Sequence, residues 1–119
     1  MHADFFFDLT AGDLDANSVA AATFSLLGVS EFERRESENY LAGEYFCAIS
    51  GGLTFEVSIN EYSDGSLFRY WLSIEDFENL NEDDFERKIS SALNKMQQRC
   101  DRVARVHDFG KKTMRVITL

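Results

Sequence analysis

The sequence has little that would suit an extracellular, membrane or catalytic role. It contains no proline, two cysteines and two histidines in 119 residues. No apolar run approaches the roughly 20 residues of a transmembrane helix, and the N-terminus lacks the basic and apolar regions of a secretion signal. Cys47 and Cys100 are therefore expected to stay free and reduced in the cytoplasm, with a disulfide between them as the alternative. Because no repeat, linker or low-complexity segment interrupts the chain, residues 1–119 are expected to form one domain.

The scarcity of histidine restricts acid–base catalysis. His2 is terminal and is expected to fray. His107 alternates with Val106, which we place on the core side, so His107 is expected to point outward. A dyad of Cys47 and His107 is conceivable on the outer face of the sheet, but nothing in the sequence brings the two together, and a half-buried cysteine is usually inert. We therefore expect no enzyme activity.

The carboxylates and glycines also fall short of a metal or phosphate site. Four acids between residues 82 and 86 point in different directions on a helix, which is typical of an acidic helix start. Asp13 and Asp15 lack the ligand spacing and the glycine of a calcium loop. Gly51 and Gly52 form too short a stretch for a phosphate cradle and do not lead into a helix. We expect no metal and no cofactor.

What the sequence has in excess is negative charge, and this charge is unevenly placed. The net charge is −9: residues 1–86 carry 19 acidic and 3 basic residues, whereas residues 87–119 carry 2 acidic and 9 basic residues. An acidic surface repels nucleic acid, attracts basic proteins and speeds their encounter. The charge order along residues 82–102 also suits a helix dipole, which accounts for part of the asymmetry without a partner. The alternative is that the acidity serves only solubility.

Period-2 alternation predicts three antiparallel strands in the middle of the chain, namely Tyr45–Ser50, Leu53–Asn60 and Leu67–Glu75. The middle strand is apolar at every second position, which is typical of a strand with one buried face. The flanking pairs Gly51-Gly52 and Asp64-Gly65 suit two-residue hairpin turns. Such turns place Val57 between Phe46 and Leu72, so the turn chemistry and the hydrophobic pattern predict the same register.

Four further strands and two helices complete the pattern. The strands are Ala3–Thr10, Glu31–Glu36, Arg102–Phe109 and Thr113–Leu119. The last two are expected to form a hairpin that pairs Val106 with Val116, and the charged second strand suits a sheet edge. The helices are Leu14–Gly28 and Asn81–Arg99, with N-caps at Asp15 and Asn81. The order strand, helix, four strands, helix, two strands predicts an α+β fold, a mostly antiparallel β-sheet with two α-helices packed on one face.

In this register, the face of the sheet that points away from the helices gathers aromatic and acidic side chains. The candidate partner-binding residues on and beside it are Trp71, Tyr62, Tyr45, Glu56, Glu75, Asp76, Glu78, Glu82, Asp83 and Asp84. An antiparallel sheet can leave one face open to water, and exposed tyrosine and tryptophan anchor interfaces while acids steer a basic partner. The alternative is that the N-terminal segment or a second copy of the chain closes this face.

In its size, its acidity and its lack of catalytic or cofactor motifs, the chain resembles the small acidic immunity proteins with which bacteria neutralise toxins. The resemblance is one of general character across the chain and carries over no residue. It implies tight, direct binding to a basic, nuclease-type toxin by a monomer or small homodimer, without direct binding to nucleic acid or membrane. Two alternatives remain. One is a phage inhibitor that mimics nucleic acid, and the other is a small ligand-binding domain or enzyme with a cavity under the helices.

Overall fold

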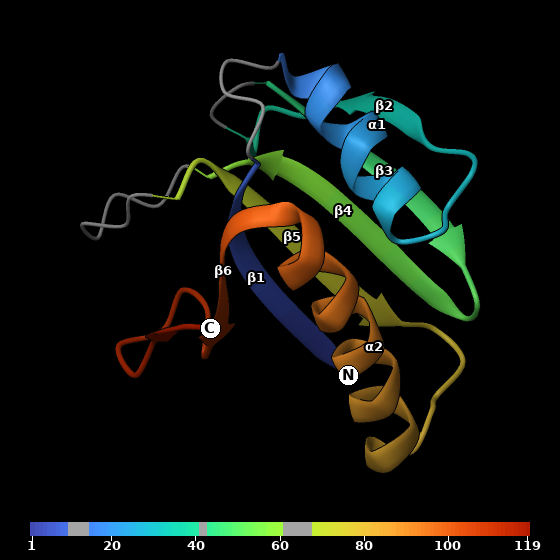
Figure 1. The fold of residues 1–119 in the computed structure, drawn as a ribbon, viewed down its shortest axis with the longest axis vertical. Helices are drawn as coiled ribbons and strands as arrows, with labels where there is room; N and C mark the ends of the chain where they lie inside the picture. Colours follow the sequence, from blue (N-terminus) through green and yellow to red (C-terminus); the bar gives the residue numbers. More distant parts are fainter. Residues whose placement is uncertain (10–14, 41–42, 61–67) are drawn as a thin grey trace.

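The computed structural model describes residues 1–9, 15–40, 43–60 and 68–119. The elements are β1 (His2–Leu9), α1 (Ala16–Leu26), β2 (Glu33–Glu36), β3 (Glu44–Ser50), β4 (Leu53–Ile59), β5 (Tyr70–Asp76), α2 (Glu82–Arg99), β6 (Cys100–His107) and β7 (Arg115–Thr118). In these parts of the chain, seven strands form one antiparallel sheet in the order β2-β3-β4-β5-β1-β6-β7. Both helices cover the same face of the sheet (Figure 1). The predicted α+β fold and its order of elements are confirmed.

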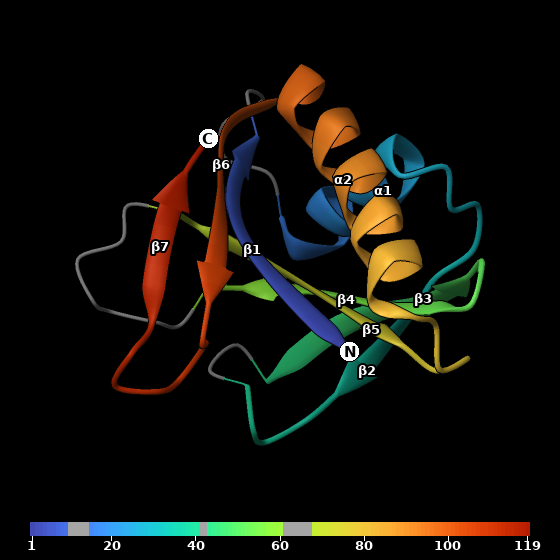
Figure 2. The same ribbon diagram turned by 90° about the horizontal axis from the view of Figure 1, so that it is seen from below.

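The predicted strand registers are also confirmed where residues are described. Val57 on β4 lies opposite Phe46 on β3 and Leu72 on β5, and Val106 on β6 lies opposite Val116 on β7. The turn predicted at Asp64-Gly65 lies outside the described residues. Figure 2 shows how strongly the sheet twists, with β6 and β7 running steeply across the direction of β3 and β4.

Strand β1 lies inside the sheet, between β5 and β6, and is buried on both faces. Phe5, Phe6 and Phe7 are consecutive and all have no exposed surface. The strand pairs with β5 on one side and with β6 on the other, so neither of its edges meets water. A run of adjacent apolar residues is what such a strand requires, because successive side chains point to opposite faces.

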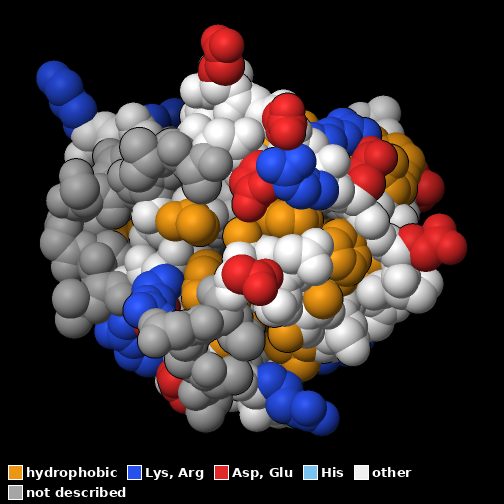
Figure 3. All heavy atoms as spheres, turned by 90° about the horizontal axis from the view of Figure 1, so that it is seen from above, with side chains coloured by type: hydrophobic (Ala, Val, Ile, Leu, Met, Phe, Trp, Pro, Cys, Tyr) orange, Lys and Arg blue, Asp and Glu red, His pale blue; other side chains and the backbone are white. Residues whose placement is uncertain are grey.

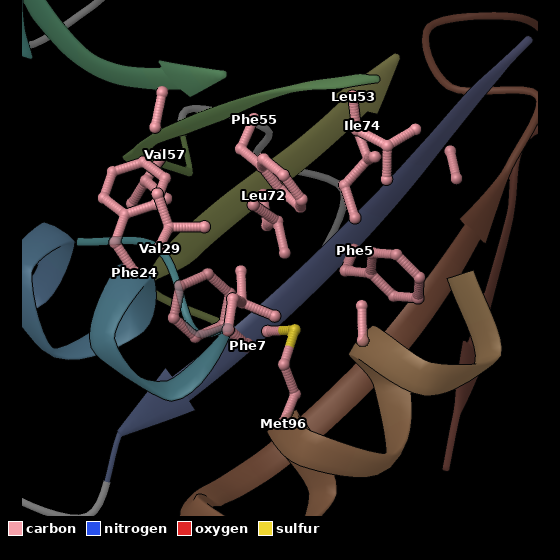
Figure 4. Packing of buried hydrophobic residues seen from close by; sticks show 14 of the residues in the cluster. Phe5, Phe7, Phe24, Val29, Leu53, Phe55, Val57, Leu72, Ile74 and Met96 are labelled. Carbon is pink, nitrogen blue, oxygen red and sulfur yellow. The ribbon is translucent and has the colours of Figure 1, made fainter. Parts of the chain in front are cut away.

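The main core lies between the sheet and the two helices. Asp15 caps α1 by accepting a hydrogen bond from the Ser18 backbone nitrogen at 2.8 Å, and Asn81 caps α2 in the same way from Asp84 at 2.8 Å. Figure 4 shows side chains from both helices, including Phe24 and Met96, packing with residues of β1, β4 and β5 in one cluster.

The side chains of β6 point to the opposite faces of the sheet from those that we predicted. Val103 packs in the core under the helices, whereas Val106, which we placed on the core side, pairs with Asp4 on the face that points away from the helices. We call that face the reverse face. Val106 and Ala104 are nevertheless buried there. Because β6 is apolar in both phases, alternation alone does not decide which phase faces the helices.

Candidate protein-binding surface

Trp71 is half-buried on the reverse face and is held there by the protein's own loops. Its ring stacks on Phe109 of the β6–β7 connection, with centroids 4.6 Å apart and planes 11° apart. Tyr40 of the β2–β3 connection stacks near the same ring at 6.3 Å. The indole Nε1–H donates to Asp4 Oδ1 at 2.8 Å. These contacts make Trp71 part of the protein's own packing.

Tyr45 and Glu56 extend this internal network. The ring of Tyr45 stacks on Tyr40 at 4.7 Å, and the Tyr40 hydroxyl donates to Glu56 Oε2 at 3.0 Å. Both predicted site residues are half-buried. The third predicted aromatic, Tyr62, lies outside the described residues. The reverse face therefore carries an aromatic row, Phe109, Trp71, Tyr40 and Tyr45, which contributes to packing.

His2, Asp4 and Ser73 have the composition of a hydrolytic triad but not its geometry. His2 Nε2 lies 2.9 Å from Ser73 Oγ and 3.2 Å from Asp4 Oδ1. A triad uses one ring nitrogen for the serine and the other for the carboxylate, whereas here both partners share Nε2. The hydrogen bond with Asp4 raises the pKa of His2, although partial burial acts against it. The cluster therefore fixes the end of β1 and does not activate a nucleophile.

A hollow of about 300 Å³ adjoins this cluster. Its lining residues are His2, Ala3, Asp4, Arg105, Val106, His107, Asp108, Phe109 and Lys111. The lining mixes cations with carboxylates, and Arg105 is already engaged by Glu86 at 2.8 Å. This balance gives the hollow no clear preference for a charged ligand.

The two cysteines are separate and unreactive in this fold. Cys47 lies on β3 and His107 on β6, four strand spacings apart, or about 19 Å along the sheet. Burial raises the pKa of the Cys47 thiol, and burial raises that of Cys100 to about 12. The separation across the sheet excludes the conceivable Cys47–His107 dyad, and the raised pKa values favour the neutral form of both thiols.

The predicted acidic residues separate into engaged and free groups. The side chain of Asp76 is only 3% exposed and accepts from the Asn79 backbone nitrogen at 3.0 Å, while Asp84 pairs with Arg87 at 3.1 Å. The remaining predicted acids are Glu75, Glu78, Glu82 and Asp83. These four are exposed, and none forms an ion pair with a described lysine or arginine. They follow one another from the end of β5 to the first turn of α2, and we call them the acidic end (lower right in Figure 1).

The acidic end includes an exposed aromatic residue that the sequence reasoning missed. Phe77 is 53% exposed, and its backbone nitrogen donates to Gly52 O at 3.2 Å, which brings the β3–β4 turn alongside. Ile49 is 68% exposed and also lies on the reverse face. It pairs with Thr54 on β4, and Thr54 pairs with Glu75 on β5. The alternation of side chains along β5 could have identified Phe77. Residues 71, 73 and 75 lie on the reverse face, and Phe77 is the next residue in this series, beyond the part of the face that the loops cover.

The edge formed by β2 contrasts with the acidic end. Its acids are compensated, since Arg34 pairs with Glu36 at 3.1 Å and also with Glu44, while Arg35 pairs with Glu33. In the view from above in Figure 3, acidic and basic side chains lie next to one another around hydrophobic ones. The acids of β2 are thus paired with arginines, whereas the four of the acidic end form no ion pair with a described lysine or arginine.

Other kinds of site find little support among the described residues. No group of three or more histidine, cysteine or acidic side chains in the described ranges is placed to bind a metal. A hollow between α1 and the sheet, lined by Val19, Phe46 and Tyr70 among others, measures about 10 Å³, roughly the room that one water needs. In the same residues no helix is long and apolar enough to cross a membrane.

The fold and surface define a class, an α+β protein with a single antiparallel sheet, helices on one face and an acidic, partly apolar end. No family model, no curated protein and no solved structure matches the chain.

Proposed function

We propose that this chain is an acidic protein-binding inhibitor that acts as a cytoplasmic immunity protein and neutralises a basic, nuclease-type toxin by direct binding. The observation that carries the proposal is the acidic end, where four exposed carboxylates that form no ion pair with a described lysine or arginine occur within a few residues of the exposed Phe77. An apolar anchor with a charged rim is the usual anatomy of a specific protein interface. The partner's basic surface would supply the charges that the acidic end lacks.

The charges at the acidic end favour rapid capture of a basic partner. Like-signed carboxylates close together create a field that raises the association rate, and this effect weakens with salt. Glu82 and Asp83 also lie in the first turn of α2, where the helix dipole stabilises negative charge. The dipole therefore stabilises Glu82 and Asp83 although neither forms an ion pair with a described lysine or arginine.

The apolar residues favour a protein partner over mimicry of nucleic acid. A mimic would present regularly spaced carboxylates, whereas here the exposed Phe77 stands between Glu75 and Glu78 in the sequence. The hollow under α1 is too small for a ligand, which argues against the alternative of a binding domain with a cavity there. Lack of enzyme activity remains part of the proposal.

The test pairs this protein with the product of the neighbouring reading frame, first by rescue of bacterial growth and then by binding kinetics at two salt concentrations. Glu75→Lys and Glu78→Lys should each slow association and weaken its salt dependence. Glu38→Lys is the matched control, because Glu38 is exposed and lies in the β2–β3 connection, away from the acidic end. The proposal is wrong if the neighbour is neither toxic nor bound, or if the control slows association as much as the two variants do.

A further inference from the structure

The two outer edges of the sheet differ in their protection against additional strands. All four residues of β2, Glu33–Glu36, are charged, and such side chains discourage pairing at an edge. Strand β7 (Arg115–Thr118) has only one charged residue. Ile117 in this strand is 43% exposed, and Leu119, just after the strand, is 50% exposed. The β7 edge therefore lacks the protection that the β2 edge has.

The backbone groups that β7 turns outward follow from its pairing with β6. The Leu119 nitrogen donates to Val103 O at 2.9 Å, and Ile117 lies opposite Arg105. In an antiparallel ladder alternate residues bond to the same neighbour, so Leu119, Ile117 and Arg115 bond toward β6. Val116 and Thr118 then point their N–H and C=O groups to the outer side. No described strand pairs with that side, so four backbone groups remain open to a new strand.

The surroundings of this edge are basic. Lys111, Lys112 and Arg115 are exposed, and none of the three side chains forms an ion pair with a described carboxylate. A second copy of β7 would bring more cations to the same edge, whereas an acidic segment would compensate them. Charge complementarity therefore selects an acidic occupant over a second copy.

We propose that β7 binds an extended acidic segment of a partner protein as an additional strand of the sheet. Backbone hydrogen bonds to Val116 and Thr118 would supply affinity, and alternate side chains of the segment would meet Ile117 and the nearby cations. This surface lies at the opposite edge of the sheet from β2 and is separate from the acidic end. The inference therefore does not depend on the proposed immunity function.

The test uses a fluorescent peptide of alternating valine and glutamate on the full chain, with a valine–lysine peptide as its charge control. Val116→Pro and Thr118→Pro each remove one outward N–H while keeping every bond to β6, and proline is tolerated on edge strands. Each should weaken binding of the acidic peptide by about fivefold to tenfold, the effect of one net hydrogen bond. Melting temperatures identify any variant that fails to fold. If one proline variant does not fold, the other alone tests the proposal.

Charge is tested with Arg115→Glu, which should weaken binding of the acidic peptide, against Lys95→Glu on α2, which should not. Hydrogen exchange at Val116 and Thr118 should slow when the peptide is added, because their amides become bonded. The proposal is overturned if the acidic peptide does not bind, if both folded proline variants bind normally, or if the lysine peptide binds equally well. Two further outcomes would assign the edge to another occupant and overturn the proposal. One is that the protein is a dimer and the proline variants are monomers. The other is that only single-stranded DNA competes for the edge.

Discussion

Trp71 on β5 donates its indole N–H to the carboxylate of Asp4 on β1, with 2.8 Å between Nε1 and Oδ1. The two residues are 67 positions apart in the sequence, and Asp4 is only 4% exposed. The hydrogen bond satisfies a buried carboxylate and fixes the ring that Phe109 covers. It makes Trp71 part of the packing between neighbouring strands.

Replacement of Trp71 should therefore reduce stability. Trp71→Ala removes the stacking with Phe109 and leaves Asp4 without this donor, and we expect a loss of about 3 kcal/mol in the free energy of unfolding. Trp71→Phe keeps an aromatic ring but loses the donor, so the loss should be about 1–2 kcal/mol. Urea denaturation measures both. An unchanged midpoint in Trp71→Ala would show that the ring contributes nothing to packing.

Phe77 should behave in the opposite way. Its ring is 53% exposed, so Phe77→Ala should change the free energy of unfolding by less than about 0.5 kcal/mol. If it anchors the interface, the same variant should speed dissociation of the partner and cost about 2 kcal/mol in binding. Ile117→Ala is the matched control, because Ile117 is similarly exposed but lies on β7. Equal dissociation rates for wild type and Phe77→Ala would exclude the ring as an anchor.

Asp8 and Arg102 form a second long-range link from β1, across the β1–β6 pair. Asp8 is 8% exposed and accepts from the Arg69 backbone nitrogen at 2.7 Å and from Arg102 Nε at 3.1 Å. The Arg102 guanidinium also lies over the Phe68 ring at 4.5 Å. Arg102→Ala should lower the free energy of unfolding by about 3 kcal/mol, because it leaves a buried carboxylate poorly compensated.

Thermal or urea unfolding of Arg102→Ala beside Lys95→Ala tests this link, since Lys95 is exposed on α2. Similar small changes in both variants would contradict a structural role for the pair.

The contact between His2 and Asp4 should make stability depend on pH. The pKa of His2 is raised in the folded protein above its ordinary value of 6.5, mainly by the hydrogen bond with Asp4. The stabilisation is therefore complete below about pH 6.5 and is lost as the pH rises through the folded pKa. Wild type should exceed His2→Gln in melting temperature by more at about pH 5.5 than at about pH 8. A difference that does not vary with pH would refute this contribution.

A charge in the core should have effects graded by burial. Val57 is 2% exposed, so Val57→Asp buries an unpaired carboxylate and should unfold the protein. Leu93 packs against the core but is only partly buried, so Leu93→Asp can turn its carboxylate toward water. We expect Leu93→Asp to fold with a lower melting temperature, as measured by circular dichroism. Cooperative melting of Val57→Asp at the wild-type temperature would contradict the assigned core.

The sequence alone was enough to predict the elements, the helix caps and the strand registers. Asp15 and Asn81 cap their helices through bonds to residues three positions away. The alternation of β4 and the glycine turn before it determine the pairing of Val57 with Phe46. These features depend on neighbours close in the chain or on a period that one strand displays by itself.

Only the tertiary structure decided what covers the reverse face and which acids remain free. Tyr40 and Phe109 come from separate connections and meet at Trp71, and no periodic pattern in either connection points to that ring. Likewise, Arg102 reaches Asp8 across 94 positions, whereas Glu78 forms no ion pair with a described lysine or arginine. Such contacts depend on how the twisted sheet brings distant loops together, because a side chain's burial and charge partners are properties of its surroundings in space.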